Sequence, residues 1–353
     1  MTAKGAAVAT APRLGGFLRS FAHRMTDEPV PLPDEGGLPS LDGASRWLNS
    51  PPLAPEDMTG RVVLVNFWTY TCINWIRTLP YLQAWDSKYR DHGLTIIGVH
   101  TPEFGFEHDL DNVIAAIGKL DVPYPVAVDN AYEIWRAFDN HFWPATYIAD
   151  GQGRIRYHHF GEGEYPMTEM VIQRLLDTGG NEPVDLDLTQ VEPAGLALGA
   201  DWHNLRTAET YLGSARISGF VSAGRSRLGE PHDYTVPVGL GFNQWALGGK
   251  WTIEPHAAIL HEPKGRVAFR FYARDLNLVM GPAQAKTPVA FRVSLDGMAP
   301  GGHHGVDVDD RGVGIVADQG LYQLIRQTGS VEDRLFEIEF EEAGVEAYSF
   351  TFG

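Results

Sequence analysis

Cysteine is nearly absent from this sequence, since Cys72 is the only one among 353 residues. A single thiol cannot close a disulfide within the chain, which excludes a disulfide-stapled fold and a cysteine-rich zinc site. If Cys72 takes part in redox chemistry, its oxidised form must therefore be resolved by the thiol of another molecule.

The sequence also lacks long apolar runs and clusters of basic residues. No segment approaches the roughly 20 consecutive apolar residues that cross a bilayer, and no apolar run of secretion-signal length stands near the N-terminus. We therefore expect no membrane span and a cytoplasmic location, where thiols are kept reduced. The 45 acidic residues outnumber the 28 basic ones, for a net charge of −17, which argues against a nucleic-acid partner.

A chain of 353 residues is longer than one hydrophobic core usually serves, which predicts two domains. Residues 1–40 are rich in Pro, Gly and Ala and predict a flexible leader. Strand and helix patterns alternate over residues 41–180, as in an α/β domain. Residues 181–195 have the composition of a linker, and residues 196–353 form short alternating runs typical of a β-sandwich or jelly roll.

The α/β domain begins at Arg61 with RVVLVNFW, an apolar run typical of a strand buried on both faces. The next segment, CINWIRTLPYLQAWDSKYRDHG, predicts a helix that Pro80 kinks and Gly93 ends. A strand (LTIIGVHT), a helix (DLDNVIAAIGKL) and a third strand (YPVAVD) are expected to follow. Two alternating runs on either side of residues 150–153 predict an antiparallel hairpin, and MTEMVIQRLLDTGG predicts the closing helix.

This order of elements resembles the thioredoxin fold. The strings VNFWTYTCIN, GVHTPEFGFE, IWRAFDNHFWPA and GRIRYHHFGEGEY are similar to the TlpA/ResA-like branch of the AhpC/TSA-redoxin superfamily and to the soluble C-terminal part of DipZ-type proteins, over residues 45–353. In that family the motif is usually Cys-Ile-Asn-Cys, whereas here Trp75 stands at the place of the second cysteine. The resemblance implies thiol oxidoreductase chemistry, and it points to an extracytoplasmic location as the alternative to the cytoplasm.

Cys72 falls at the junction between a buried strand and a helix, where unpaired backbone N–H groups and the helix dipole predict a lowered thiol pKa. A thiolate there is a nucleophile towards peroxides or disulfides. The alternative is an inert thiol that acts as a small buried hydrophobe. Trp75 has two interpretations as well: it closes over the thiol, or it fills the space of a lost cysteine in a protein without redox chemistry.

Two positions near the cysteine support a reactive thiol. Thr69 gives a T-x-x-C spacing similar to the peroxiredoxin active site, although such a threonine is commonly a local hydrogen-bonder. Pro144 stands where the resemblance implies a cis proline that faces the cysteine, with Trp143 beside it to present the substrate. The simpler alternative for Pro144 is a proline at the start of a strand.

Three charged or titratable residues are further candidates. Arg77, one turn into the helix, supports the thiolate or a bound anion, or else is a solvated helix residue. Glu103 and His108 follow the second strand, where active-site loops of such sheets collect, and either is a candidate proton shuttle or a solvated loop residue.

Paired histidines occur twice in the sequence, at 158–159 and at 303–304. Adjacent side chains on a strand point to opposite faces, so neither pair has the spacing of a metal site. We predict no metal and no cofactor.

The second half resembles the DipZ C-terminal module, a sandwich similar to carbohydrate-binding modules, through the strings ETYLG, NQWALGGKWTI, ARDLNLV and GVEAYSFTFG. Such modules stack aromatic side chains on sugars, which makes Trp202, Tyr211, Trp245 and Trp251 candidates, unless they belong to the core. The other roles left open are a homodimer interface and docking on the α/β half to shape its cleft.

Two functions therefore compete. The first is a thiol-dependent oxidoreductase or peroxidase with Cys72 as the nucleophile, and with an external thiol or a protein thiol or disulfide as partner. The second is a redox-inactive thioredoxin-fold binding protein whose sandwich recognises a glycan or a partner protein.

Overall fold

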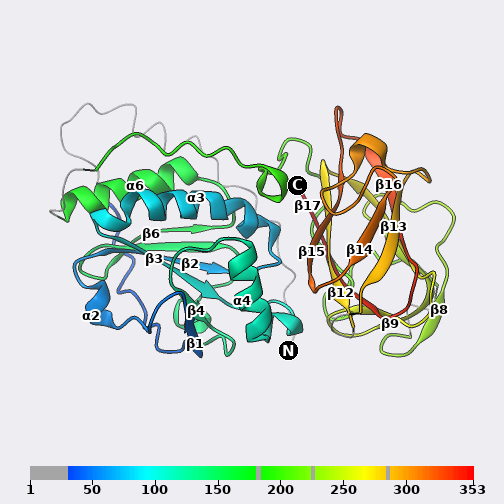
Figure 1. The fold of residues 1–353 in the computed structure, drawn as a ribbon, viewed down its shortest axis with the longest axis horizontal. Coiled ribbons are helices and arrows are strands. Elements are labelled where there is room, and N and C mark those ends of the chain that lie inside the picture. The colour runs from blue at the N-terminus through cyan, green and yellow to red at the C-terminus, as the bar shows by residue number, and fades with distance from the viewer. Residues whose placement is uncertain (1–30, 180–183, 224–226, 284–286) are drawn as a thin grey trace. The chain divides into compact units, whose positions relative to one another are not determined.

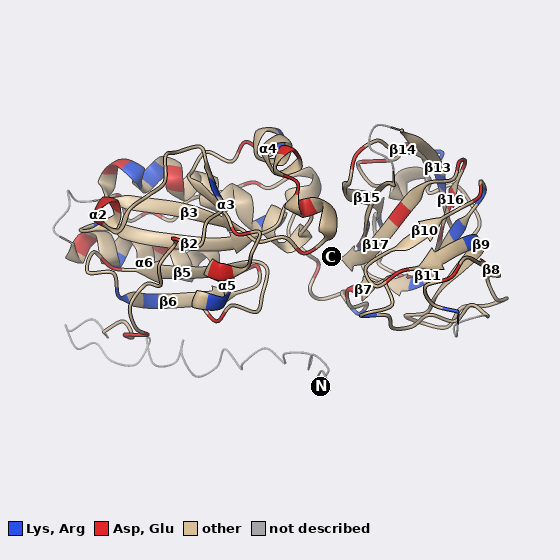
Figure 2. Cartoon of the chain, turned by 90° about the horizontal axis from the view of Figure 1, so that it is seen from below, with Lys and Arg blue, Asp and Glu red and all other residues tan. Residues whose placement is uncertain are grey.

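The computed structural model describes residues 31–179, 184–223, 227–283 and 287–353, and residues 34–353 form one compact unit with two sheets (Figure 1). Acidic and basic residues are interspersed along both halves of this unit (Figure 2). In the described residues no helix combines the length and apolarity that crossing a membrane requires.

The first sheet is mixed and has six strands in the order β1-β4-β3-β2-β5-β6. The parallel pairs are β2 with β3 and β3 with β4, whereas β5 and β6 form an antiparallel hairpin beside β2. This arrangement confirms the predicted thioredoxin-like α/β fold. The strands are β1 (Arg46–Leu48), β2 (Val62–Trp68), β3 (Leu94–His100), β4 (Val126–Val128), β5 (Ala145–Ala149) and β6 (Ile155–Phe160).

Helices cover this sheet, and α3 and α6 lie side by side over one face (Figure 1). Pro80 lies inside α3, which continues past it until Arg90–His92 form a 3-10 turn and Gly93 adopts a left-handed conformation with φ 99°. The helices are α2 (Pro55–Met58), α3 (Ile73–Tyr89), α4 (Leu110–Lys119), α5 (Glu133–Ala137) and α6 (Tyr165–Thr178), with 3-10 turns η1 (Arg90–His92) and η2 (Gly105–His108).

The segments at the ends of the α/β half are more ordered than a leader and a linker would be. The backbone N–H of Glu35 donates to Ile155 and that of Leu38 to Gly153, so this part of the predicted leader is folded against β6. Residues 1–30 of the predicted leader and 180–183 around the linker lie outside the described residues. In the linker, the Thr189 hydroxyl donates to the Glu169 carboxylate of α6 over 2.6 Å.

The second sheet has eleven strands, all antiparallel, and curls around its own core as expected of a sandwich. Its path is β14-β13-β16-β11-β9-β10-β17-β12-β15, with β7 beside β17 and β8 beside β9. The strands are β7 (Thr210–Tyr211), β8 (His232–Tyr234), β9 (Trp245–Ile253), β10 (Ala258–Leu260), β11 (Arg266–Tyr272), β12 (Asp275–Pro282), β13 (Val289–Leu295), β14 (Val313–Val316), β15 (Gly320–Arg326), β16 (Asp333–Phe340) and β17 (Val345–Phe352), with 3-10 turns η3 (Gly195–Ala197) and η4 (Gly301–His303).

Aromatic and aliphatic side chains fill the core of the sandwich. Trp245 and Trp251 are part of it and have no exposed surface. Of the two alternatives for these residues, the core is the one that the structure shows, because a buried indole offers no face to a sugar.

Candidate functional site

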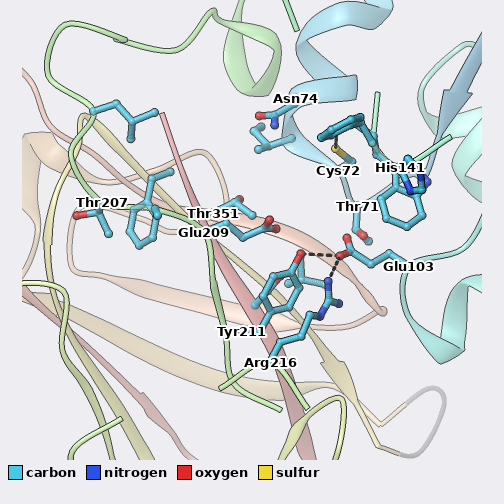
Figure 3. Close-up of a pocket in the computed structure, with 18 of the residues that line it drawn as sticks. Thr71, Cys72, Asn74, Glu103, His141, Thr207, Glu209, Tyr211, Arg216 and Thr351 are labelled. Atoms are coloured by element: carbon cyan, nitrogen blue, oxygen red, sulfur yellow. Dashed lines mark hydrogen bonds and ion pairs between the residues drawn. The ribbon is translucent and has the colours of Figure 1, made fainter. Parts of the chain in front are cut away.

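A cavity of about 370 Å³ surrounds Cys72, and both halves of the compact unit line it (Figure 3). The α/β half contributes residues 71–74, Glu103 and residues 141–143. The sandwich half contributes residues of β7, β12 and β17 and of the segments before and after β7. The lining residues are Thr71, Cys72, Ile73, Asn74, Glu103, His141, Phe142, Trp143, Trp202, Leu205, Thr207, Ala208, Glu209, Tyr211, Arg216, Val279, Ser349, Thr351 and Phe352.

Cys72 is the N-cap residue of α3 and is half-buried. Its carbonyl oxygen accepts the N–H of Ile76, the first bond of the helix, and its own N–H donates to Thr69. Its Sγ lies 3.7 Å from the carbonyl oxygen of Trp143, to which the thiol donates. Trp143 therefore lies beside the cysteine, and its peptide bond to Pro144 is cis.

The pKa of Cys72 is raised, not lowered as its helix position predicts. Burial is the largest cause, and the negative charges of Glu103 and Glu209 add to it. The backbone N–H groups of Trp75 and Asn74 do favour the thiolate, as a helix N-terminus should, but they are outweighed. The prediction considered only the helix, whereas the sandwich encloses the thiol and brings a carboxylate to it.

Glu103 joins the two halves at the edge of the cavity. Its Oε1 accepts the Tyr211 hydroxyl over 2.6 Å and forms an ion pair with Arg216 over 3.0 Å (Figure 3). The Arg216 guanidinium lies 3.4 Å from the centre of the Tyr211 ring, a cation–π contact. Because Arg216 covers this face of Tyr211, the predicted sugar-stacking role of Tyr211 has no support.

Glu107 is a site residue that the sequence analysis missed. It is fully buried in η2, and its carboxylate accepts the Thr71 hydroxyl over 2.5 Å and the backbone N–H groups of Glu103 and Phe104 over 2.6 and 2.9 Å. Burial raises the pKa of Glu107 to about 6, although the hydroxyls of Thr69 and Thr71 oppose this shift. Glu107 thereby connects the loop before Cys72 with the loop that carries Glu103.

Glu209, just before β7, was also missed. It lines the cavity, and its side chain is exposed. Desolvation and the charge of Glu103 raise the pKa of Glu209 to about 7, and the positive charge of Arg216 opposes this shift. No sequence signal marks this residue, because its neighbours in the cavity come from distant parts of the chain.

Trp75 and Thr69 lie near Cys72 in sequence but do not line its cavity. The Trp75 indole has no exposed surface, stacks on Trp68 with ring centres 4.1 Å apart, and donates to Asn66 Oδ1 over 3.0 Å. Trp75 therefore fills the domain core and does not cover the thiol. Thr69 is also fully buried.

Neither of the two alternatives for Arg77 matches the structure, because its side chain lies away from the thiolate and is not solvated. Its side chain is 1% exposed and forms an ion pair with Glu162 over 3.0 Å and with Asp275 of β12 over 3.9 Å. Arg77 thus belongs to the contact between the halves, because α3 carries it towards the sandwich.

The remaining candidates lie apart from the thiol or at the rim. His108 is exposed and does not line the cavity. Trp202 lines the cavity and is 63% exposed. In the part of the chain that the structure describes, no group of three or more His, Cys, Asp or Glu side chains is placed to hold a metal ion.

Comparison with known proteins agrees with the fold. Residues 51–158 match the AhpC/TSA family, and residues 207–353 match the family described as thioredoxin like C-terminal domain. The fold and these matches define a thioredoxin-like protein of two modules.

Its curated relatives narrow this class. Protein DipZ of Mycobacterium bovis is 32% identical over 288 residues, which cover 78% of this chain and 40% of DipZ. Thiol-disulfide oxidoreductase YkuV of Bacillus subtilis is 27% identical over 39% of this chain and 93% of YkuV, and thiol-disulfide oxidoreductase ResA of Bacillus cereus is 25% identical over 34% of this chain and 66% of ResA. The chain is a homologue of these proteins and spans about 40% of the length of DipZ.

Proposed function

We propose that this protein carries out thiol-disulfide exchange with Cys72 as a single nucleophile. The observation that carries the proposal is the position of the only thiol, at the start of α3, in a cavity and beside the cis Trp143–Pro144 bond. The relatives named thiol-disulfide oxidoreductases support the same chemistry.

In the exchange, the Cys72 thiolate attacks one sulfur of a disulfide, and the other sulfur leaves as a thiolate. The N–H groups of Asn74 and Trp75 stabilise the attacking sulfur. Glu103 and Glu209 border the same cavity and are the candidate acceptors for the proton of the thiol. Because Trp75 occupies the place where the family usually has a second cysteine, a thiol from another molecule completes the cycle.

A disulfide is favoured over a peroxide as the substrate. The predicted peroxide chemistry relies on a Thr69 hydroxyl beside the sulfur, but Thr69 is fully buried and does not line the cavity of Cys72. Cys72 instead has an open cavity on its side, which offers room for a second sulfur and its substituent.

The test is to mix the reduced, native protein with bis(2-hydroxyethyl) disulfide and to follow its intact mass. We expect a mixed disulfide that is absent from Cys72→Ser and is released by added thiol. If the native protein stays unmodified while the urea-unfolded protein reacts, Cys72 is inert in the folded state and the proposal fails.

A further inference from the structure

The charges that line the cavity do not cancel. Glu103 is paired with Arg216 and accepts the Tyr211 hydroxyl. Glu209 lines the same cavity as Cys72, and the Arg216 guanidinium, which pairs with Glu103, acts on Glu209 through its charge. The cavity thus holds two carboxylates and one guanidinium. One carboxylate is therefore left to attract a cation close to the thiol.

The size of the cavity limits what fits beside Cys72. A volume of about 370 Å³ lies at the lower end of the range for small-molecule sites. The sandwich supplies one wall, and the bonds from Tyr211 and Arg216 to Glu103 close this side. Trp202 and Phe142, which are 63% and 48% exposed, leave apolar surface among the lining residues.

We infer that the cavity binds a low-molecular-weight aminothiol, as the thiol or as its disulfide, with the ammonium group at Glu209 and the sulfur at Cys72. Figure 3 shows the Cys72 sulfur and the Glu209 carboxylate on the borders of the same space. The inference rests on the proposed exchange at Cys72 and names its small partner. Glu209 is a specificity-determining residue in this account, supplied by the sandwich half.

The step itself balances without a further reactant. The Cys72 thiolate attacks one sulfur of the aminothiol disulfide, the original S–S bond breaks, and a bond forms between Cys72 and one half of the molecule. The other half leaves as a thiolate and takes up the proton that Cys72 has lost. The ammonium group only orients the disulfide and takes no part in the electron transfer.

The experiment compares three disulfides of similar size: cystamine, which is dicationic, bis(2-hydroxyethyl) disulfide, which is neutral, and dithiodipropionate, which is dianionic. Rates of mixed-disulfide formation are measured by intact mass at about pH 8, where Glu209, with a pKa of about 7, is mostly ionised. Each rate is divided by the rate for urea-unfolded protein, so that intrinsic reagent reactivity cancels. The variants are Glu209→Gln, Glu209→Asp and, as a matched control, Glu230→Gln at an exposed carboxylate of the sandwich that does not line the cavity.

We expect the corrected rate for cystamine to exceed that for the neutral disulfide by about fivefold, the worth of one charge pair at about 4 Å in water. The preference should vanish in Glu209→Gln and persist in Glu209→Asp and Glu230→Gln. Equal corrected rates, or a preference that survives Glu209→Gln, overturn the inference but leave the exchange at Cys72 intact.

Two further outcomes are decisive. A disulfide-linked decapeptide dimer with a corrected rate above that of cystamine would show that the cavity admits polypeptides, which overturns the assignment to a small molecule. No reaction of the native protein with any disulfide overturns the exchange and the inference together.

Discussion

Burial affects the pKa of Cys72 more than the helix that begins beside it does. The N–H groups of Trp75 and Asn74 favour the thiolate, but desolvation and two carboxylates leave its pKa above the ordinary value. The thiol is thus held mostly protonated at neutral pH, and exchange is rapid only when a substrate or a base in the cavity promotes loss of the proton.

The alkylation of Cys72 should show this directly. Because its pKa is raised, the rate with iodoacetamide in native protein should keep rising beyond the free-thiol pKa of about 8.5 and stay below the rate of the unfolded chain. The rate is measured across the alkaline range with Cys72→Ser as the blank. A native rate that levels off below about pH 8 would contradict the prediction and point to an activated thiolate.

Trp75 fixes the core where the family usually has its second cysteine. Trp75→Cys would remove a fully buried indole, its stack on Trp68 and the donor to Asn66. We expect a loss of about 3 kcal/mol or more in the free energy of unfolding, since the site cannot collapse around so large a void. Urea unfolding in the presence of a reductant measures this loss in the free energy of unfolding.

The matched control is Trp202→Cys, which alters a tryptophan that is 63% exposed. Its effect on the free energy of unfolding should stay within about 0.5 kcal/mol, as for most surface changes. Similar losses for the two variants would mean that the Trp75 site has repacked around the cysteine.

Between elements, Glu107 connects the loop after β2 with the loop after β3. Its pKa of about 6 lies above the ordinary 4.5, so folded protein holds this proton more tightly than unfolded protein does. The contribution of this proton to the free energy of unfolding is fully present below about pH 4.5 and is lost as the pH rises through about 6.

The stability of the wild type relative to Glu107→Gln should therefore fall with rising pH. A pKa shift of this size corresponds to about 2 kcal/mol between pH values well below 4.5 and above 6. Urea unfolding of both proteins at the two extremes measures the difference, in which the other titrating groups cancel. A difference that does not change with pH would place the Glu107 pKa at its unfolded value.

The elements were predictable and the buried carboxylates were not. The strand β2 reads as a continuous apolar run, and α3 shows its apolar stripe and its stop at Gly93, because both signals are local. Glu107 and Glu209 carry no local signal, since the surroundings that raise their pKa values include groups from distant parts of the chain. The same limit explains why the sequence predicted a lowered pKa for the Cys72 thiol, whereas the structure raises it.

In the whole compact unit, the sandwich completes a site that the thioredoxin-like half begins. Tyr211 and Arg216 bind Glu103 at the cavity, and Asp275 meets Arg77 of α3. Docking of the sandwich on the α/β half was one of three roles left open by the sequence, because a charged residue on a helix does not reveal a partner on a distant strand.

Asp275 contributes a buried carboxylate to the contact between the halves. It has no exposed surface and pairs with Arg274 and Arg326 over 2.7 Å each, and with Arg77 over 3.9 Å. Asp275→Asn keeps the shape but leaves the guanidinium groups without their shared anion. We expect a loss of about 3–5 kcal/mol in the free energy of unfolding, typical of breaking a buried ion pair.

The control is Asp333→Asn, which breaks the exposed pair with Arg270 and should cost less than about 1 kcal/mol. Tryptophan fluorescence and far-UV circular dichroism follow the unfolding in urea. If the halves support each other through Asp275, the two signals coincide in the wild type and in Asp333→Asn, and separate in Asp275→Asn as one half unfolds first. Coincident curves with an equal, small loss in both variants would mean that the halves do not depend on this cluster.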